Sequence, residues 1–216
     1  MLSKEEIDIF RNVTKYADKF RWETYRNQIV EVLARDFESI LIIGVGDGIV
    51  PLMIKFCLSQ LNLNTKVTTL DLEEDLNPDI VGDIREIKNL TKAQKFDCIL
   101  CCQVLEHIEF KYLEQILSDF STIAKTIIIS LPHARRSIFH FTLKVPKIKK
   151  IDINILIPRK FKGIKIHKYH YWELGSWGEC CSIKKIEEIF NKNFVITKKY
   201  HVPDVKYHLF YVLSSL

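Results

Sequence analysis

The sequence predicts an α/β fold built on a doubly wound, mostly parallel sheet. Apolar runs of strand length alternate with apolar-periodic stretches of helix length between residues 39 and 131. The run Cys98–Cys102 is apolar at every position, which is typical of parallel strands buried on both faces. A glycine-rich turn follows the first of these strands, at the sheet edge where such folds bind ligands.

The elements are predicted in chain order from their periodicity. Residues 1–35 carry two apolar stripes at helical spacing, which predict two N-terminal helices. The alternating part is predicted as strand 39–44, helix 49–61, strand 66–71, strand 97–102, helix 110–124 and strand 126–131, with a loop and a short helix between 72 and 95. A serine-capped amphipathic helix over 182–190 and two apolar runs at 194–197 and 209–213 predict a final helix and an antiparallel hairpin.

We therefore expect one domain over residues 1–216. It divides into N-terminal helices (1–35), a ligand-binding core (36–133), an insertion or lid (134–180) and the C-terminal helix and hairpin (181–216). No apolar run approaches the roughly 20 residues that cross a bilayer, so no membrane span is expected. The N-terminus lacks the apolar region of a signal peptide, and two pairs of adjacent cysteines indicate reduced thiols in a cytoplasmic protein.

Charge is concentrated in one part of the predicted insertion. Residues 134–170 contain eleven Lys or Arg and a single acid, Asp152, whereas the whole chain carries a net charge of only +5. A basic segment on an otherwise acidic body favours an anionic partner. The alternative is a solvated surface without a partner.

The glycine-rich turn runs from Gly44 through Gly46 to Gly48, at every second position. Glycine allows unusual backbone dihedrals and close approach of a ligand, and the following helix N-terminus presents free N–H groups. Asp71 ends the second predicted strand, where an acid can accept both hydroxyls of a ribose. The sequence therefore predicts a site for a nucleoside-containing cofactor.

The identity of that cofactor follows from a family resemblance. A nicotinamide dehydrogenase would have Gly-x-Gly-x-x-Gly, which this chain does not match. The Gly-x-Gly-x-Gly turn, Asp71, Gly82-Asp83-Ile84 and the stretch from Phe96 to His107 instead resemble, in order, the landmarks of class I S-adenosylmethionine-dependent methyltransferases, which have a Rossmann-like fold. The resemblance covers about residues 36–132. It implies S-adenosyl-L-methionine as cofactor, bound by Gly44, Val45, Gly46, Gly48, Asp71, Leu72, Asp83, Ile84, Gln103 and Val104.

One position departs from the family pattern. The family usually has an acid two residues before the first glycine, and this chain has Ile42 there. We expect another group, Asp47 or the carbonyl region at Gln103, to bind the ammonium group of the methionine moiety.

Three histidines are candidates for the catalytic base. His107 follows the fourth strand and His133 the fifth, so both belong to the ligand edge, and His170 lies in the insertion with Glu173 as a possible orienting acid. Each has a structural alternative: His107 can order its turn, and His133 can be an ordinary loop residue. No metal is expected, because methyl transfer from a sulfonium requires none and the cysteines lack metal-site spacing.

The stretch 167–173 is dense in aromatic residues and histidines. Tyr169, Tyr171, Trp172 and Glu173 are predicted to contact the methyl acceptor, and Arg135 and Arg136 to bind its negative charge. The alternative is an aromatic anchor that fixes the insertion to the body.

The arrangement of segments resembles methyltransferases of bacterial surface-glycan and natural-product pathways. This resemblance implies a bacterial enzyme and does not identify the substrate. With the basic segment 134–170, it leads us to expect methylation of O or N of an anionic small molecule or glycan. Two other hypotheses stay open: an RNA or protein methyltransferase that docks its acceptor on the basic segment, and a non-catalytic module that only binds the cofactor.

Overall fold

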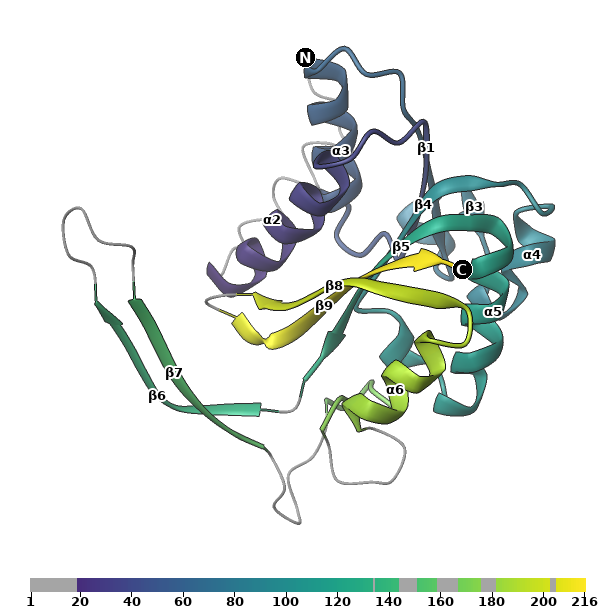
Figure 1. The fold of residues 1–216 in the computed structure, drawn as a ribbon. Coiled ribbons are helices and arrows are strands. Elements are labelled where there is room, and N and C mark those ends of the chain that lie inside the picture. Colours follow the sequence, from purple (N-terminus) through teal and green to yellow (C-terminus); the bar gives the residue numbers. More distant parts are fainter. Residues whose placement is uncertain (1–18, 134, 144–150, 159–166, 176–181, 203–204) are drawn as a thin grey trace.

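The computed structural model describes residues 19–133, 135–143, 151–158, 167–175, 182–202 and 205–216 (Figure 1). Within them a seven-stranded sheet has the order β3-β2-β1-β4-β5-β9-β8. Its strands are β1 (Ser39–Ile43), β2 (Lys66–Asp71), β3 (Ile80–Val81), β4 (Phe96–Cys102), β5 (Ala124–Pro132), β8 (Phe194–Val202) and β9 (Val205–Ser215). Strands β1 to β5 pair in parallel, whereas β9 runs antiparallel to β5 and β8. The predicted mostly parallel sheet with a C-terminal antiparallel hairpin is confirmed.

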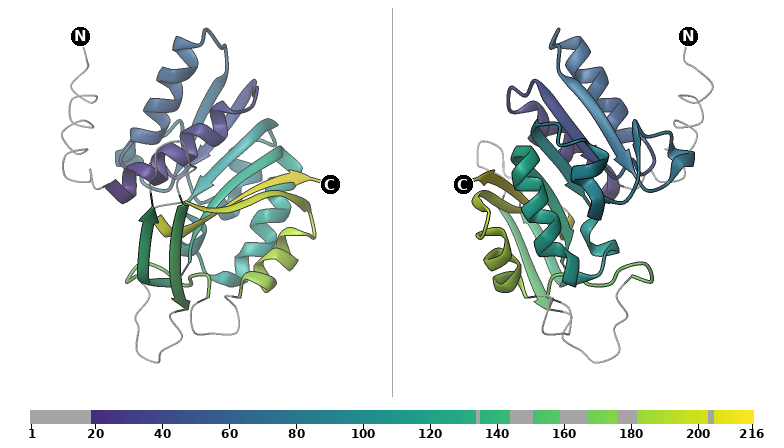
Figure 2. Two further views of the ribbon diagram at one scale, coloured as in Figure 1. Left: turned by 60° about the vertical axis from the view of Figure 1, so that its left-hand side comes forward. Right: turned by 90° about the vertical axis from the view of Figure 1, so that its right-hand side faces the viewer.

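Helices cover both faces of this sheet, as Figures 1 and 2 show. They are α2 (Lys19–Leu33), α3 (Ile49–Gln60), α4 (Ile87–Leu90), α5 (Leu113–Ile123) and α6 (Ile183–Phe190), with 3-10 turns η1 (Glu74–Leu76), η2 (Ile84–Glu86), η3 (Leu105–His107) and η4 (Phe110–Tyr112). Helices α2 and α3 cover one face, and α4, α5 and α6 cover the other.

Alternate residues of the same strands supply two separate cores. In β1, Ile40 and Ile42 join the cluster under α2 and α3, whereas Leu41 and Ile43 join the cluster under α5 and α6. The same alternation recurs in β4 and β5. Because successive side chains of a strand point to opposite faces, apolar residues at every position are what a sheet covered on both sides requires.

The register of the central strands places the ligand edge. Ile43 of β1 lies beside Leu70 of β2 on one side and Cys101 of β4 on the other. The chain therefore leaves these three strands at nearly the same height. Strand order reverses between β1 and β4, which is the crevice where open α/β sheets bind ligands.

The structure contains strands that the sequence did not predict. Strand β3 has two residues, too few to produce a periodic signal. The predicted insertion contains a two-stranded antiparallel sheet, β6 (Arg135–Leu143) with β7 (Ile151–Pro158), which projects from the end of β5 in Figure 1. These two strands were not predicted from the sequence, because the prolines and charged residues of the segment obscured the alternation of its apolar residues. The first of the two predicted N-terminal helices lies outside the described residues. No described helix is both long and apolar enough to span a membrane.

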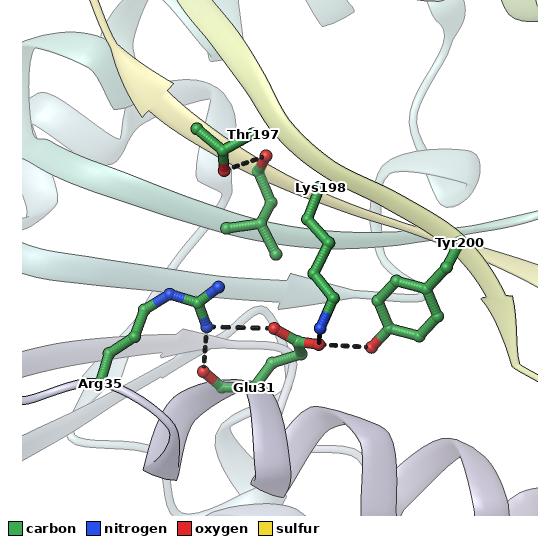
Figure 3. A network of polar contacts seen from close by, with 6 residues as sticks. Glu31, Arg35, Thr197, Lys198 and Tyr200 are labelled. Carbon is green, nitrogen blue, oxygen red and sulfur yellow. Dashed lines mark hydrogen bonds and ion pairs between the residues drawn. The ribbon is translucent and has the colours of Figure 1, made fainter.

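Helix α2 is held to the C-terminal hairpin by one buried carboxylate (Figure 3). Glu31 accepts hydrogen bonds from Lys198, from the Tyr200 hydroxyl at 2.8 Å and from Arg35 at 3.0 Å. Burial alone would raise the pKa of Glu31, but these three donors outweigh it, and the pKa is lowered. Glu31 is therefore a charged link between α2 and β8.

Replacing Glu31 with Gln removes this charge and leaves the shape of the side chain. We expect the variant to lose about 1–3 kcal/mol of unfolding free energy at neutral pH, measured by urea denaturation. Because the folded-state pKa is lowered, the contribution is present above the ordinary pKa of 4.5 and disappears as the pH falls through the folded-state value, so the two proteins should converge in acid. Glu188→Gln is the control, since Glu188 forms only an exposed pair with Lys184. A constant difference at every pH would contradict this account.

Candidate functional site: a cavity at the carboxyl edge of the sheet

A cavity of about 1270 Å³ opens where β1, β2 and β4 end. Its wall is completed by the first half of α2, by His167, His170 and Tyr171 of the insertion, and by Tyr207 and His208 of β9. The predicted cofactor residues that line it are Gly44, Val45, Gly46, Asp71, Leu72, Asp83, Ile84, Gln103 and Val104. Gly48 does not line the cavity; it is the N-cap of α3. The structure thus brings nine of these ten residues to one wall.

The turn after β1 depends on glycine at its first position. Gly44 has a φ of +84°, and a Cβ at this residue would lie 2.5 Å from Cγ2 of Val104. The residue is constrained both by its backbone and by the close approach of the turn after β4. This contact brings the first and fourth strand ends together at the cavity floor.

Asp71 connects β2 to the same turn. Its Oδ2 accepts a hydrogen bond from the Val45 N–H at 2.6 Å, and its Oδ1 accepts one from the Glu73 N–H at 3.0 Å. A carboxylate offers about four lone-pair sites, so both oxygens retain acceptor capacity at the cavity wall. Two neighbouring hydroxyls of a ribose can donate to them.

Asp83 is fixed by its own turn. Arg85 donates to it through the backbone N–H and through Nε, both at 2.9 Å. The hydrogen bonds from the Arg85 side chain, which outweigh the effect of burial, lower the pKa of Asp83. The carboxylate is therefore an ionised, oriented acceptor beside Ile84, suited to an exocyclic amine.

Helix α2 closes the cavity over the glycine turn. The Tyr25 hydroxyl donates to Asp47, and Arg21 lies 3.9 Å from the same carboxylate oxygen. Burial and the bond to Asp47 raise the pKa of Tyr25 well above its ordinary value, so the hydroxyl stays a donor. Asp47 lines the cavity but already contacts these two partners, and Gln103, with a φ of +58°, lines it from the turn after β4. The ammonium site expected at one of these two positions stays a prediction.

Two of the predicted catalytic histidines meet at the other end of the cavity. The ring centres of His107 and His170 lie 4.9 Å apart, edge to face. His107 Nδ1 lies 3.0 Å from the Tyr169 carbonyl oxygen, and His170 Nδ1 lies 2.9 Å from Oε1 of Glu173. Burial lowers the pKa of His107. The structure therefore contains a histidine–carboxylate pair with the geometry of a base and its orienting acid.

Glu173 orients His170 from inside the protein and does not line the cavity. Its Oε1 also accepts from the Tyr207 hydroxyl at 2.7 Å and from the His167 N–H at 3.3 Å. Burial alone would raise the pKa of Glu173, but these hydrogen bonds outweigh it and the pKa is lowered. Glu173 was predicted to contact the methyl acceptor. In the structure it contacts His170 instead.

The structure corrects two other assignments. His133, a candidate base, is only 3% exposed, does not line the cavity and has its Nδ1 2.9 Å from Nε2 of His201. Trp172, a candidate acceptor contact, is 1% exposed in the core, with its indole N–H bound to the Ile108 carbonyl at 2.9 Å. Trp172 is thus the anchor that was the alternative hypothesis.

The other residues predicted to contact the acceptor lie in different places. Tyr171 lines the cavity, whereas Tyr169 is exposed, lies under Lys168 and does not line it. Arg135 and Arg136 begin strand β6, whose side chains lie outside the described part of the structure. Their role stays a prediction.

Several cavity residues were not predicted as site residues. Tyr25 and Thr24 of α2 are brought over the sheet edge by tertiary packing, and His208 arrives from the last strand, with its Nδ1 2.8 Å from the Thr24 hydroxyl. Burial lowers the pKa of His208 to about 4. Glu106 differs from these residues, because the sequence does contain a signal for it: a charged residue lies close after the apolar strand β4.

Glu106 is also the most unusual group at the site. It is 0% exposed, and neither carboxylate oxygen has a hydrogen-bond partner among the described residues. Burial, with a smaller effect of the charge on Glu173, raises the pKa of Glu106 to about 8. A buried carboxyl group without a partner is costly to keep.

Comparison with solved structures shows the fold of class I S-adenosylmethionine-dependent methyltransferases. A protein from Pyrococcus horikoshii OT3 is 15% identical with a TM-score of 0.56 over 91% of this chain and 90% of that one. Magnesium protoporphyrin IX methyltransferase from Synechocystis PCC 6803, solved with bound SAH, is 13% identical with a TM-score of 0.59 over 99% and 95%. The small RNA methyltransferase HEN1 is 12% identical with a TM-score of 0.59, over 91% of this chain and 25% of HEN1. No family model and no curated sequence matches the chain.

Replacing Gly44 with Ala tests the constraint on the turn. We expect a loss of about 1–2 kcal/mol of unfolding free energy from the positive φ and a further loss of about 1–3 kcal/mol from the clash with Val104. Gly46→Ala is the matched control, because Gly46 also has a positive φ but a Cβ there meets no atom within 4 Å. Equal losses in urea denaturation would show that the approach of Val104 is not the limiting contact.

Proposed function

We propose that this protein transfers a methyl group from S-adenosyl-L-methionine to an oxygen or nitrogen atom of an anionic small molecule or glycan. The observation that carries the proposal is the hydrogen bond between the Val45 N–H and Asp71, which joins the glycine turn to the ribose acid at one cavity wall. The cavity continues from there to His107 and His170. Ligand pockets usually measure about 300–1,000 Å³, so this one has room for donor and acceptor together.

The cofactor half is supported by three placed groups. The Gly44 turn leaves room for close approach, Asp71 presents free acceptor capacity, and Asp83 presents an ionised acceptor further along the wall. A solved neighbour with this fold carries bound SAH. The tighter glycine spacing argues against a dinucleotide.

The acceptor half supports the chemical step. Methyl transfer is an in-line displacement: the acceptor atom forms a bond to the methyl carbon, and the carbon–sulfur bond breaks with its electron pair moving to sulfur. The protein chiefly holds the two reactants in line. His170, oriented by Glu173, is placed to take the proton that a hydroxyl or amine must lose.

The anionic character of the acceptor is supported by the sequence. Two described parts of the basic segment 134–170 lie near the site: β6 follows β5 along the chain, and His167 and His170 line the cavity. Exposed positive charge beside a cavity raises the local concentration of an anion.

The first test of this function is cofactor binding. We expect calorimetry to show roughly micromolar binding of S-adenosylmethionine and S-adenosylhomocysteine and none of NAD. Asp71→Asn should weaken binding of both by about 1.5–3 kcal/mol, or about tenfold to a hundredfold, because a charge-assisted acceptor is lost. Asp75→Asn, which removes an exposed charge nearby without altering the cavity wall, is the control. Undiminished binding by Asp71→Asn, or binding of NAD, would refute the assignment.

The second test identifies the acceptor. Phosphorylated sugars, acidic glycans, tRNA and peptides are incubated with cofactor labelled in its methyl group. Label on a sugar or glycan supports the proposal, and label on tRNA or peptide would replace it by the RNA or protein hypothesis. Cofactor binding without label on any acceptor would favour the non-catalytic module.

Charge reversal then tests the basic segment with the acceptor so identified. Arg135→Glu with Arg136→Glu should raise the acceptor KM steeply and leave cofactor affinity unchanged. The effect should shrink with added salt, because exposed charges are screened over about 8 Å at physiological ionic strength. Lys184→Glu with Lys185→Glu, on exposed positions of α6 away from the cavity, is the matched control. An unchanged KM at every salt concentration would show that these arginines are merely solvated.

A further inference from the structure

The buried carboxyl group of Glu106 has no role in the cofactor site. It lines the cavity and is fully buried, and no other described residue donates a hydrogen bond to either oxygen. Buried polar groups in proteins nearly always have a partner, and a buried charge is generally paired or bound to a metal. We therefore expect a ligand to bind Glu106.

Two histidines share this position. Glu106, His107 and His170 each offer an atom that can bind a metal ion, and these atoms all lie within 4.8 Å of one another. Two separate parts of the chain supply them, the turn after β4 and the insertion. The Tyr171 N–H donates to the Glu106 carbonyl at 2.8 Å, which holds the two parts together.

The hydrogen bonds at the two Nδ1 atoms leave the Nε2 atom of each imidazole available. His107 Nδ1 faces a carbonyl oxygen, which can only accept, and His170 Nδ1 faces the carboxylate of Glu173. Both Nδ1 atoms can therefore donate a hydrogen bond, which leaves the two Nε2 atoms to bind a metal ion. Metal-bound histidines typically have this arrangement, with the second nitrogen donating to a carbonyl or carboxylate.

We propose that Glu106, His107 and His170 bind one divalent transition-metal ion, with Zn²⁺ the best match, at the acceptor end of the cavity. Two imidazoles and one carboxylate are a donor set found in catalytic zinc sites, which keep one position open. Tetrahedral bonds of about 2.0–2.1 Å would place the ligand atoms about 3.4 Å apart, so small side-chain movements suffice. Mg²⁺ is a poor match, because it prefers oxygen ligands. This proposal replaces the expectation from sequence that no metal takes part.

The site gives the insertion a second task, which rests on the proposed function. An acceptor hydroxyl in the open position would lose its proton more readily, as water does on zinc. With its Nε2 on the metal, His170 would no longer act as the base described under the proposed function. The proton would pass to solvent, and the resulting oxygen would attack the methyl carbon as the carbon–sulfur bond breaks. Binding of the metal itself does not depend on methyl transfer.

The test measures metal binding by the full chain without cofactor. Protein freed of metal with a chelator is titrated with Zn²⁺ by calorimetry and with Co²⁺ by visible absorption, whose bands report tetrahedral geometry. We expect one equivalent to bind and Mg²⁺ not to compete. Glu106→Gln, His107→Asn and His170→Asn should each weaken binding about a hundredfold, and Glu173→Gln, a positioning residue, about tenfold to a hundredfold with altered Co²⁺ bands.

His167→Asn is the matched control, because His167 lines the same cavity and its ring lies 4.8 Å from that of His170, but it is outside the three-residue group. It should retain the affinity of the unchanged protein. Should the ligand variants fail to fold, anomalous scattering from crystals of the unchanged protein soaked in Zn²⁺ decides directly, with a peak expected between Glu106 and the two imidazoles. No Zn²⁺ or Co²⁺ binding by the unchanged protein, a peak elsewhere, or equal binding by all variants would overturn the proposal. Cofactor binding is measured separately, so failure here leaves the proposed function standing.

Discussion

The hydrogen bond from the Val45 N–H to Asp71 joins the ends of β1 and β2 across the opening of the cavity. It can form only because parallel pairing sets Ile43 beside Leu70, so that the following residues leave the sheet together. The close approach of Gly44 and Val104 adds the end of β4 to the same arrangement. The cofactor wall is thus a product of strand register, and every residue assigned to it depends on the two cores that fix that register.

The part of the cavity wall formed by His167, His170 and Tyr171 is held in a different way. Residues 167–174 form no strand of the main sheet, and they are fixed to it by single hydrogen bonds from Tyr171 to Glu106, from Trp172 to Ile108 and from Leu174 to Pro132. The first two bonds join the segment to the turn after β4, and the third joins it to the end of β5. The polar side chains of this segment are thus held at the cavity by a few hydrogen bonds, and not by the continuous hydrogen bonding of paired strands.

Elements of the fold could be predicted from the sequence where their pattern of residues lies within a short stretch of the chain. The strands β1, β2, β4 and β5 and the helix after the glycine turn were recognisable because each has its own periodicity and boundary residues. Asp71 was named from its place at the end of β2 and Asp83 from the family resemblance; both line the cavity, and their contact with the cofactor stays a prediction. Strand β3 was not predictable, because it has two residues and depends on pairing with β2.

The acceptor side was predicted less well because its geometry is set by distant contacts. The sequence placed His133 at the end of β5 but could not show that it packs against His201 of β8. It likewise could not separate Trp172, which turns inward, from Tyr171, which faces the cavity. Pairing of His107 with His170 joins residues 63 positions apart, and no local pattern encodes that meeting.

The two means of attachment have an evolutionary consequence. Changing a residue in β1 or β4 disturbs a core, whereas the described part of 167–175 contributes only Trp172 and Leu174 to one. Lineages can therefore exchange the composition and length of the loop between β5 and α6 while the sheet persists. Solved structures at 12–15% identity share the fold of this chain. Under the proposed function, the acceptor side of the site could diversify by changes in this loop, provided that its few anchors to the sheet are kept.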